Sequence, residues 1–272
     1  MHMRVKAIYF SPTGTTEKII ESIVKGIGPE ELDCIDLTKR DAIDRKGHAG
    51  IGKEDLVLVG APVYGGFLYK DFRNYIKCID FNNRPVAIGL LYGNATVLCA
   101  KSEIVSLVQE RNGRVIGYGD FVGEHSFSTR EIPVAIGRPD TDDLNTAFLF
   151  GKDLRNALER AHATQCDQHM RLLGTCIGQV ADMKPLHTGK RFFSVPRTER
   201  ELCNRCGVCI KKCPRACIDQ EFRTDGNECI VCMACVKACH SNARATKAKS
   251  PLVAYGLRLM NRRKNESSFT VW

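Results

Sequence analysis

Short hydrophobic runs alternate with amphipathic segments over the first 165 residues. Runs rich in β-branched residues predict strands that are buried on both faces, and the longer segments between them have the spacing of helices. The predicted strands are Arg4–Phe10, Leu32–Leu37, Asp55–Ala61, Pro85–Tyr92 and Arg114–Gly119, with a longer alternative to Phe127 for the last. The predicted helices are Thr15–Ile27, Tyr69–Ile79, Val97–Asn112 and Asp142–Ala163. This alternation is typical of an α/β fold, a doubly wound five-stranded parallel sheet with crossover helices.

The second half of the chain has a different composition. Residues 1–150 have a formal net charge of −2 and residues 151–272 one of +11, while nine of the 14 cysteines lie between Cys203 and Cys239. Such a break predicts two domains. We expect an α/β domain (1–165), a connector without clear periodicity (166–195), a small α+β Cys-rich domain (196–247) and a basic tail (248–272).

The Cys-rich domain contains an internal repeat. The pattern Cys-x-x-Cys-x-x-Cys-x-x-x-Cys starts at Cys203 and again at Cys229, so each cysteine recurs 26 positions later. Thiolates with this spacing can surround one corner of an iron–sulfur cubane, with the fourth ligand arriving from elsewhere in the chain. Structural zinc is the alternative, but zinc ribbons use two separated ligand pairs and do not need the third and fourth cysteine of each run.

The repeat resembles the bacterial-type ferredoxins that carry two [4Fe–4S] clusters. In that family each run receives its fourth ligand from the other repeat. The resemblance therefore implies one cluster on Cys203, Cys206, Cys209 and Cys239, and a second on Cys229, Cys232, Cys235 and Cys213. His240 stands where the family usually has a second proline, and we expect it to be an exposed turn residue.

The other cysteines have no such pattern. Cys217 aligns with Ala243 of the second repeat and is expected to pack as a small apolar residue. Buried free thiols are the expectation for Cys34, Cys78, Cys99, Cys166 and Cys176. His162, Cys166 and His169 have spacing suggestive of a zinc site but lack a fourth partner.

A hydroxyl-rich turn, residues 11–16, follows the first predicted strand and runs into a helix. Backbone amides, hydroxyls and the positive end of the helix dipole can bind a phosphate there, and the absence of a Walker lysine favours a monophosphate over a magnesium-bound triphosphate. A hydroxyl-rich helix cap is the alternative. The turn resembles the phosphate loop of flavodoxins, with the pattern S/T-x-T-G-x-T, which implies a site for flavin mononucleotide (FMN) at the carboxyl edge of the sheet.

Two further loops at that edge contain glycine and an aromatic residue. By the same resemblance, Tyr64 or Tyr92 would flank the flavin ring and Gly65 or Gly66 would present a backbone group to it. The expected FMN-binding residues are Ser11, Thr13, Gly14, Thr15, Thr16, Pro62, Val63, Tyr64, Gly65, Gly66, Tyr92, Gly93 and Asn94. No dinucleotide fingerprint accompanies them, because Asp55 replaces the third glycine after Gly50 and Gly52.

His125 follows the fifth predicted strand and is the candidate catalytic residue. It would donate a proton to a reduced flavin or a substrate; a structural loop histidine is an equally good interpretation. The whole chain resembles the fused flavodoxin-like and bacterial ferredoxin proteins of anaerobes, the ferrodoxins. The resemblance implies intramolecular electron transfer between FMN and two [4Fe–4S] clusters, as an electron carrier in anaerobic metabolism. The alternative is a ferredoxin-fed, FMN-dependent reductase of an organic acceptor.

The partners expected from the charge pattern are acidic redox proteins, with a small-molecule acceptor as a further option. Nucleic acid is not expected, because Lys211, Lys212, Arg215, Arg262 and Arg263 lack interleaved aromatic residues. Membrane association is also not expected, and the tail is predicted to pack against the flavin domain. A cytoplasmic protein is predicted, since the chain enters its first strand directly and its longest apolar stretch, Pro85–Ala100, is too short to span a bilayer.

Overall fold

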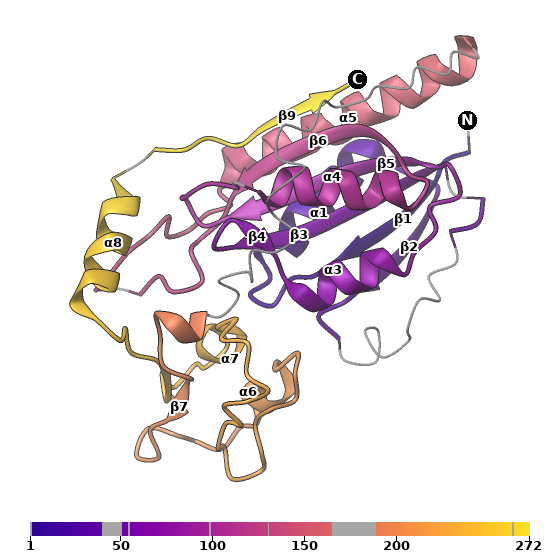
Figure 1. Cartoon of the computed structure of the whole chain (residues 1–272). Helices are drawn as coiled ribbons and strands as arrows, with labels where there is room; N and C mark the ends of the chain where they lie inside the picture. The colour runs from indigo at the N-terminus through magenta and orange to yellow at the C-terminus, as the bar shows by residue number, and fades with distance from the viewer. Residues whose placement is uncertain are drawn as a thin grey trace.

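A parallel sheet forms the centre of the first domain. The computed structural model describes residues 2–39, 51–53, 55–97, 99–129, 131–164, 189–262 and 264–272. The parallel strands are β1 (Arg4–Tyr9), β2 (Glu31–Asp36), β3 (Leu56–Tyr64), β5 (Pro85–Tyr92) and β6 (Arg114–Val122), in the order β2-β1-β3-β5-β6 (Figure 1). The predicted α/β fold with a mostly parallel sheet is therefore confirmed, and β3 and β6 each end three residues later than expected.

Helices cover both faces of this sheet. The helix α1 (Thr15–Ile27) packs beside α5 (Thr141–Thr164) on one face, and α3 (Lys70–Lys77) and α4 (Ala100–Glu110) cover the other (Figure 1). All eight residues of β5 are buried, as expected for a central strand between two helical layers. Because the strands are parallel and packed between helices, their carboxyl ends lie along one edge of the sheet. The loops that follow the strands therefore lie side by side at that edge.

The two helices α1 and α5 approach each other closely through a pair of glycines. A Cβ atom added at Gly26 would lie 2.0 Å from the Phe148 carbonyl oxygen, and one at Gly151 would lie 2.1 Å from the Ile23 carbonyl oxygen. Both contacts are with backbone atoms, which cannot rotate away as a side chain can. Only glycine permits this helix spacing.

The end of the chain extends the sheet. The strand β9 (Ser268–Val271) pairs antiparallel with β6, and the short β4 (Phe67–Leu68) forms a hairpin with β3, so the sheet has more strands than the five predicted. The prediction missed both strands because they are short: β4 has two residues and β9 has four. The segment expected to be a basic tail also contains α8 (Pro251–Asn261), whose N-cap Ser250 accepts a hydrogen bond from the Leu252 amide at 3.2 Å.

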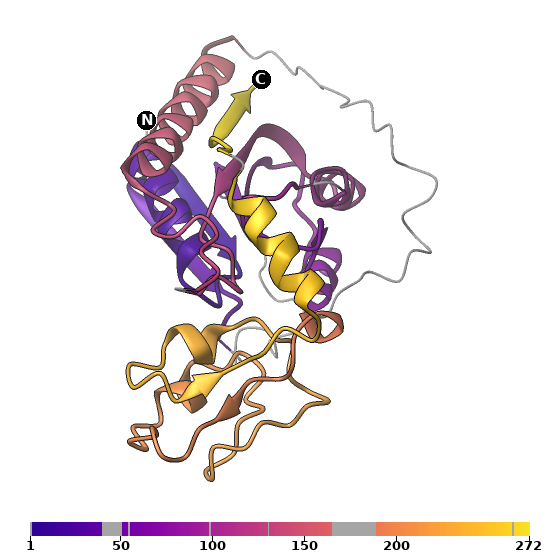
Figure 2. The ribbon, with the colours of Figure 1, turned by 90° about the vertical axis from the view of Figure 1, so that its left-hand side faces the viewer.

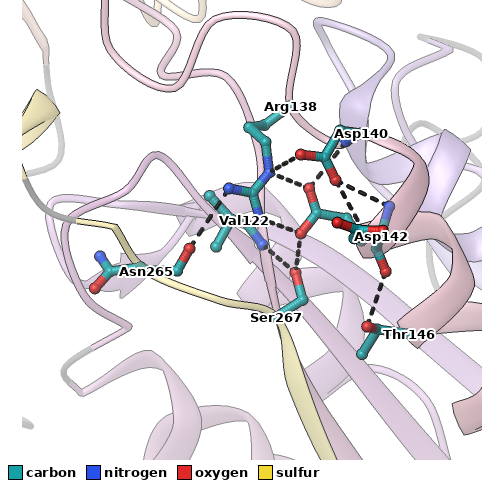
Figure 3. Close-up of polar contacts among 8 residues, drawn as sticks. Val122, Arg138, Asp140, Asp142, Thr146, Asn265 and Ser267 are labelled. Carbon is teal, nitrogen blue, oxygen red and sulfur yellow. Dashed lines mark hydrogen bonds and ion pairs between the residues drawn. The ribbon is translucent and has the colours of Figure 1, made fainter.

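A buried ion pair fixes the C-terminal segment against the sheet domain (Figure 3). The Arg138 guanidinium bonds both oxygens of the Asp143 carboxylate, which also accepts a hydrogen bond from the Ser267 hydroxyl at 2.5 Å. The Ser267 oxygen in turn accepts the Val122 amide at 3.0 Å. Burial raises the pKa of Asp143, but the bonds from Arg138 and Ser267 outweigh it and leave the pKa below its usual value.

The Cys-rich domain is a small unit beside the carboxyl edge of the sheet (Figure 1). It contains the short helix η1 (Gly189–Arg191), the antiparallel pair β7 (Arg197–Thr198) and β8 (Arg244–Ala245), and the single-turn helices α6 (Val208–Lys211) and α7 (Ala234–Lys237). The helices α6 and α7 begin 26 residues apart, so the repeat in sequence is also a repeat in structure. Among the described residues, no helix is long and apolar enough to cross a membrane.

The thiols outside the repeat differ in part from the prediction. Cys34 and Cys78 are exposed rather than buried, because β2 is an edge strand and Cys78 caps the end of α3. Cys99 is partly buried. Cys166, Cys176 and His169 lie outside the described residues, as does the side chain of His162.

Candidate functional site

A cavity of about 590 Å³ lies at the carboxyl edge of the sheet, within the size range of small-molecule sites. The sheet domain contributes the turns after β1 and β3, the end of β5 and the loop after β6. The predicted residues that line it are Thr13, Thr15, Pro62, Val63, Tyr64, Gly65, Gly66, Tyr92, Gly93 and His125. Tertiary structure thus brings three predicted loops and the candidate histidine to one cavity.

The hydroxyl-rich turn, residues 11–16, has a preorganised backbone. Gly14 has a left-handed φ of 81° at the N-cap of α1, and the Ser11 hydroxyl accepts the Glu17 amide at 2.9 Å. The hydroxyls of Thr13 and Thr15 lie 3.2 Å apart at the cavity wall. The Thr16 hydroxyl is buried and has no hydrogen-bond partner within the described ranges. A buried polar atom without a partner costs free energy, so the chemistry of this turn fits a phosphate, whose oxygens accept hydrogen bonds.

The two predicted aromatic residues differ in their surroundings. Tyr64 is half-buried, and its pKa is raised well above the usual value by burial and by the nearby Cys232 thiol. Tyr92 is buried at the end of β5, and burial followed by the Asp120 carboxylate raises its pKa. Both tyrosines therefore stay neutral across the physiological range. The turn after Tyr64 contains Gly65 and Gly66 with φ of 60° and 89°, which few side-chain-bearing residues adopt.

Asn94 has a structural contact that the sequence did not predict. Its side-chain amide donates to the Met260 carbonyl at 2.9 Å, and its own carbonyl accepts from Asn265 at 3.1 Å. These bonds fix the C-terminal end of α8 against the sheet domain (Figure 2). Five residues of α8 complete the cavity wall, namely Leu252, Val253, Gly256, Leu257 and Met260.

His125 is positioned as a neutral hydrogen-bond donor. Its Nδ1 accepts the Phe127 amide at 3.2 Å, so the neutral ring carries its proton on Nε2. Burial, followed by the nearby Lys237 ammonium, lowers the pKa of His125 to about 4. The ring packs on Gly93, where an added Cβ would lie 2.6 Å from His125 Cδ2. Near neutral pH this residue can donate a hydrogen bond but carries no charge.

The Cys-rich domain contributes a wall that sequence reasoning did not identify. Ile230 and Val231, which separate Cys229 from Cys232, line the same cavity. Phe193 also lines it and stacks on Phe127 of the sheet domain, with ring centroids 3.7 Å apart. The spacing of the cysteines gave no signal for this contact, because it depends on how the two domains pack.

The backbone of each cysteine run curls through left-handed positions. Arg205 and Gly207 in the first run match Val231 and Met233 in the second, each pair 26 residues apart and each residue with φ between 53° and 72°. A left-handed conformation is strained for a β-branched residue such as Val231. It turns successive amides inward, an arrangement that binds anions and occurs at many iron–sulfur sites. The Val231 amide accordingly donates to the Cys229 sulfur at 3.4 Å.

The two predicted ligand sets have different exposure. Cys229, Cys232, Cys235 and Cys213 line one small cavity, together with Cys217. In the other set, Cys206 is exposed and only Cys209 is buried. We call the first set the inner thiols and the second set, Cys203, Cys206, Cys209 and Cys239, the outer thiols.

The Cys217 thiol does more than fill space. It is buried as expected, but its sulfur lies 3.4 Å from that of Cys213. A hydrogen bond from Cys217 lowers the pKa of Cys213 to about 6 and that of Cys229 to about 7. The surroundings of these two inner thiols therefore favour the thiolate, the form that binds metal. Among the described side chains, no three of His, Cys, Asp or Glu are grouped closely enough to hold one metal ion.

Comparisons with known proteins match the sheet domain to flavodoxins. Residues 7–104 match the flavodoxin domain family. Flavodoxin 1 of Salmonella typhimurium is 30% identical over 132 residues, which cover 45% of this chain and 72% of that protein. Pyruvate synthase subunit PorD of Methanothermobacter marburgensis is 30% identical over 70 residues, which cover 26% of this chain and 86% of the subunit. A solved flavodoxin of Fusobacterium nucleatum bound to flavin mononucleotide aligns with a TM-score of 0.38 and 14% identity, over 58% of this chain and 97% of that one.

Proposed function

The chain belongs to the flavodoxin family through its sheet domain, and on that basis we propose that it transfers electrons between a bound FMN and two [4Fe–4S] clusters. FMN accepts one or two electrons, whereas each cluster carries one at a time. The protein would supply position, burial and hydrogen bonds to these groups. Its role would be that of an electron carrier.

The support for FMN comes from the site at the carboxyl edge. The phosphate would lie at the N-terminus of α1 beside Thr13, Thr15 and the unpartnered Thr16 hydroxyl. The ring would lie between the glycine turn after Tyr64 and the loop after Tyr92. A flavodoxin match and a cavity of this size are both what such a site requires.

The support for iron–sulfur clusters comes from the cysteine pattern, which occurs twice, and from the backbone amides that turn inward in each run. We assign the inner cluster to the inner thiols and the outer cluster to the outer thiols. A single zinc ion needs all its sulfur ligands about 2.3 Å from one point, whereas a cubane holds its four thiolates on separate corners.

The contact of Ile230 and Val231 with the cavity is the observation that carries this proposal. These two residues lie between two inner thiols and also line the flavin site, so the inner cluster would be next to FMN. The Cys232 thiol also raises the pKa of Tyr64 electrostatically, after the larger effect of burial, which agrees with this adjacency. Electrons would then pass between FMN and the inner cluster, and between the outer cluster and an external partner.

Metal and flavin analysis of anaerobically purified protein tests the proposal. We expect about eight irons and one FMN per chain, because two cubanes and one flavin are assigned. Flash reduction of the flavin should be followed by absorbance changes of the clusters within the same molecule, at a rate independent of protein concentration. Iron-free protein with stoichiometric zinc would contradict the cluster assignment, while leaving the FMN site intact.

A second candidate is a reductase that passes electrons from FMN to an organic acceptor. His125 favours it, because a neutral Nε2–H donor lies at the cavity wall. His125→Gln keeps a hydrogen-bond donor but removes the titrating ring. We expect this variant to bind FMN and to lose acceptor-dependent flavin reoxidation at least tenfold; equal reoxidation rates in parent and variant would reject the catalytic role.

We further propose an acidic redox protein as the external partner. Arg205 and Lys211 are exposed in or beside the first cysteine run, and neither forms an ion pair in the part of the chain that the structure describes. Steering by such charges is screened by salt. Intermolecular electron transfer should slow as ionic strength rises, and Lys211→Glu should weaken that dependence.

A further inference from the structure

Arg244 is a buried cation at the start of β8. Only 3% of it is exposed. Its Nη1 donates to the Thr198 hydroxyl at 2.7 Å and the Phe222 carbonyl at 3.1 Å, and its Nη2 donates to the Thr224 hydroxyl at 2.6 Å and the Pro196 carbonyl at 3.1 Å. All four acceptors are neutral. They orient the guanidinium but do not balance its charge.

No carboxylate among the described residues forms an ion pair with Arg244. Two half-buried arginines of the chain are different, since Arg138 and Arg215 both bond acidic side chains. Within the described ranges, the buried Nε of Arg244 also has no hydrogen-bond partner. An arginine removed from water needs a compensating negative charge, because an unpaired buried charge is strongly destabilising.

The nearest candidate counter-charge is sulfur. Arg244 Nη2 lies 3.6 Å from the Cys235 sulfur, within hydrogen-bond reach of a thiolate. Cys235 is the third cysteine of the second run and belongs to the inner thiols.

The internal repeat provides only one such charge. The position that matches Arg244 in the first repeat, 26 residues earlier, is Ile218, which is buried among apolar side chains. A symmetric pair of halves would place either two isoleucines or two arginines at the centre of the unit. The repeat instead has one buried cation, and it lies within reach of the inner thiol Cys235.

We propose that Arg244 is the counter-charge of the inner iron–sulfur cluster and raises its reduction potential. This inference rests on the proposed function. One-electron reduction adds a negative charge to a cluster that its thiolates already make anionic, so a fixed cation stabilises the reduced form more than the oxidised one. Arg244 is a positioning residue: it acts through the Cys235 sulfur, and the clusters carry the electrons.

The test compares two variants that each remove one positive charge from this domain. Arg244→Gln removes the buried cation, while Arg223→Gln removes an exposed one that pairs with Asp219 at 2.9 Å. Iron content and FMN are measured first, and midpoint potentials are then determined by EPR-monitored titration of the anaerobic holoprotein with dithionite as electron donor. We expect Arg244→Gln to lower the one-electron reduction constant of the inner cluster tenfold, a shift of about 59 mV to more negative potential. Arg223→Gln should leave both potentials unchanged.

Unchanged potentials in Arg244→Gln would overturn the inference. If that variant does not retain iron, Arg244→Lys tests the role of the charge instead, because lysine keeps the positive charge but has fewer hydrogen-bond donors. We expect Arg244→Lys to assemble both clusters with potentials close to the parent. If the lysine variant also loses iron, or if its reduction constant falls as much as tenfold, Arg244 has a structural role only. Absence of iron from the parent protein would instead refute the proposed function itself.

Discussion

Arg215 of the Cys-rich domain donates a hydrogen bond to the Asp71 carboxylate at 2.7 Å, joining residues 144 positions apart. The same guanidinium bonds Glu228 at 2.5 Å. In a second link between the domains, Lys237 pairs with Glu124 at 2.5 Å and donates to the Ser128 carbonyl at 2.8 Å. These ion pairs hold the Cys-rich domain against the sheet domain at the cavity.

Loss of the Arg215–Asp71 pair should loosen this contact. In Arg215→Gln we expect a stability loss of about 1 kcal/mol, since the pair is partly solvated, and a several-fold slower intramolecular electron transfer after flash reduction of the flavin. Arg223→Gln, which breaks an exposed ion pair within the Cys-rich domain, is the matched control. Equal transfer rates in the two variants would show that the Arg215 pair does not set the distance between the redox groups.

Removing the unpartnered hydroxyl of Thr16 should have opposite effects on stability and on binding. Thr16→Val removes a buried polar atom without a partner, so the FMN-free protein should gain about 1 kcal/mol in its free energy of unfolding. The same change removes a donor to the phosphate and should weaken FMN binding about tenfold, measured by quenching of flavin fluorescence. The half-buried Thr146 on α5, whose hydroxyl donates to the Asp142 carbonyl, provides the control Thr146→Val for FMN binding. Unaltered FMN affinity would place the phosphate elsewhere.

The contact between α1 and α5 makes Gly151 sensitive to a single methyl group. Gly151→Ala would place a Cβ against the Ile23 carbonyl and should cost about 2 kcal/mol in urea unfolding. Gly256→Ala is the matched control, because an added Cβ in the middle of α8 meets no atom within 4 Å. That variant should be stabilised by up to about 1 kcal/mol. Equal stabilities of the two variants would show that the helices can separate without cost.

The buried Asp143 should make stability depend on acid pH. Its folded-state pKa is lowered, so its stabilising contribution is complete above the unfolded value of about 3.9 and is lost as the pH falls through the folded value. Asp143→Asn should therefore cost about 3 kcal/mol at pH 7, and the gap to the parent should close below about pH 4. The neighbouring Asp142 is exposed, and Asp142→Asn should change stability by less than about 0.5 kcal/mol. A gap that persists unchanged at pH 3 would contradict this assignment.

The sequence alone determined the periodic elements. The predicted helix Thr15–Ile27 and strand Pro85–Tyr92 match α1 and β5 at both ends, because their hydrophobic spacing and their burial have the same cause. The hydroxyl-rich turn and the doubled cysteine spacing were equally visible, since both kinds of site depend on residues that are close in sequence. The expectation of buried thiols at Cys34 and Cys78 was wrong, because a strand pattern does not reveal which strand lies at an edge.

Only the tertiary structure decided which distant segments of the chain meet. The contacts of Ile230 with the flavin site, of Asn94 with α8, of β9 with β6 and of Arg244 with Cys235 join segments that no local pattern relates. The local sequence pattern determines the backbone conformation of each helix or strand and the face that it buries. The placement of one buried charge beside the thiol of Cys235 depends instead on how the repeats and the domains pack, which is a balance of burial and charge over the whole molecule.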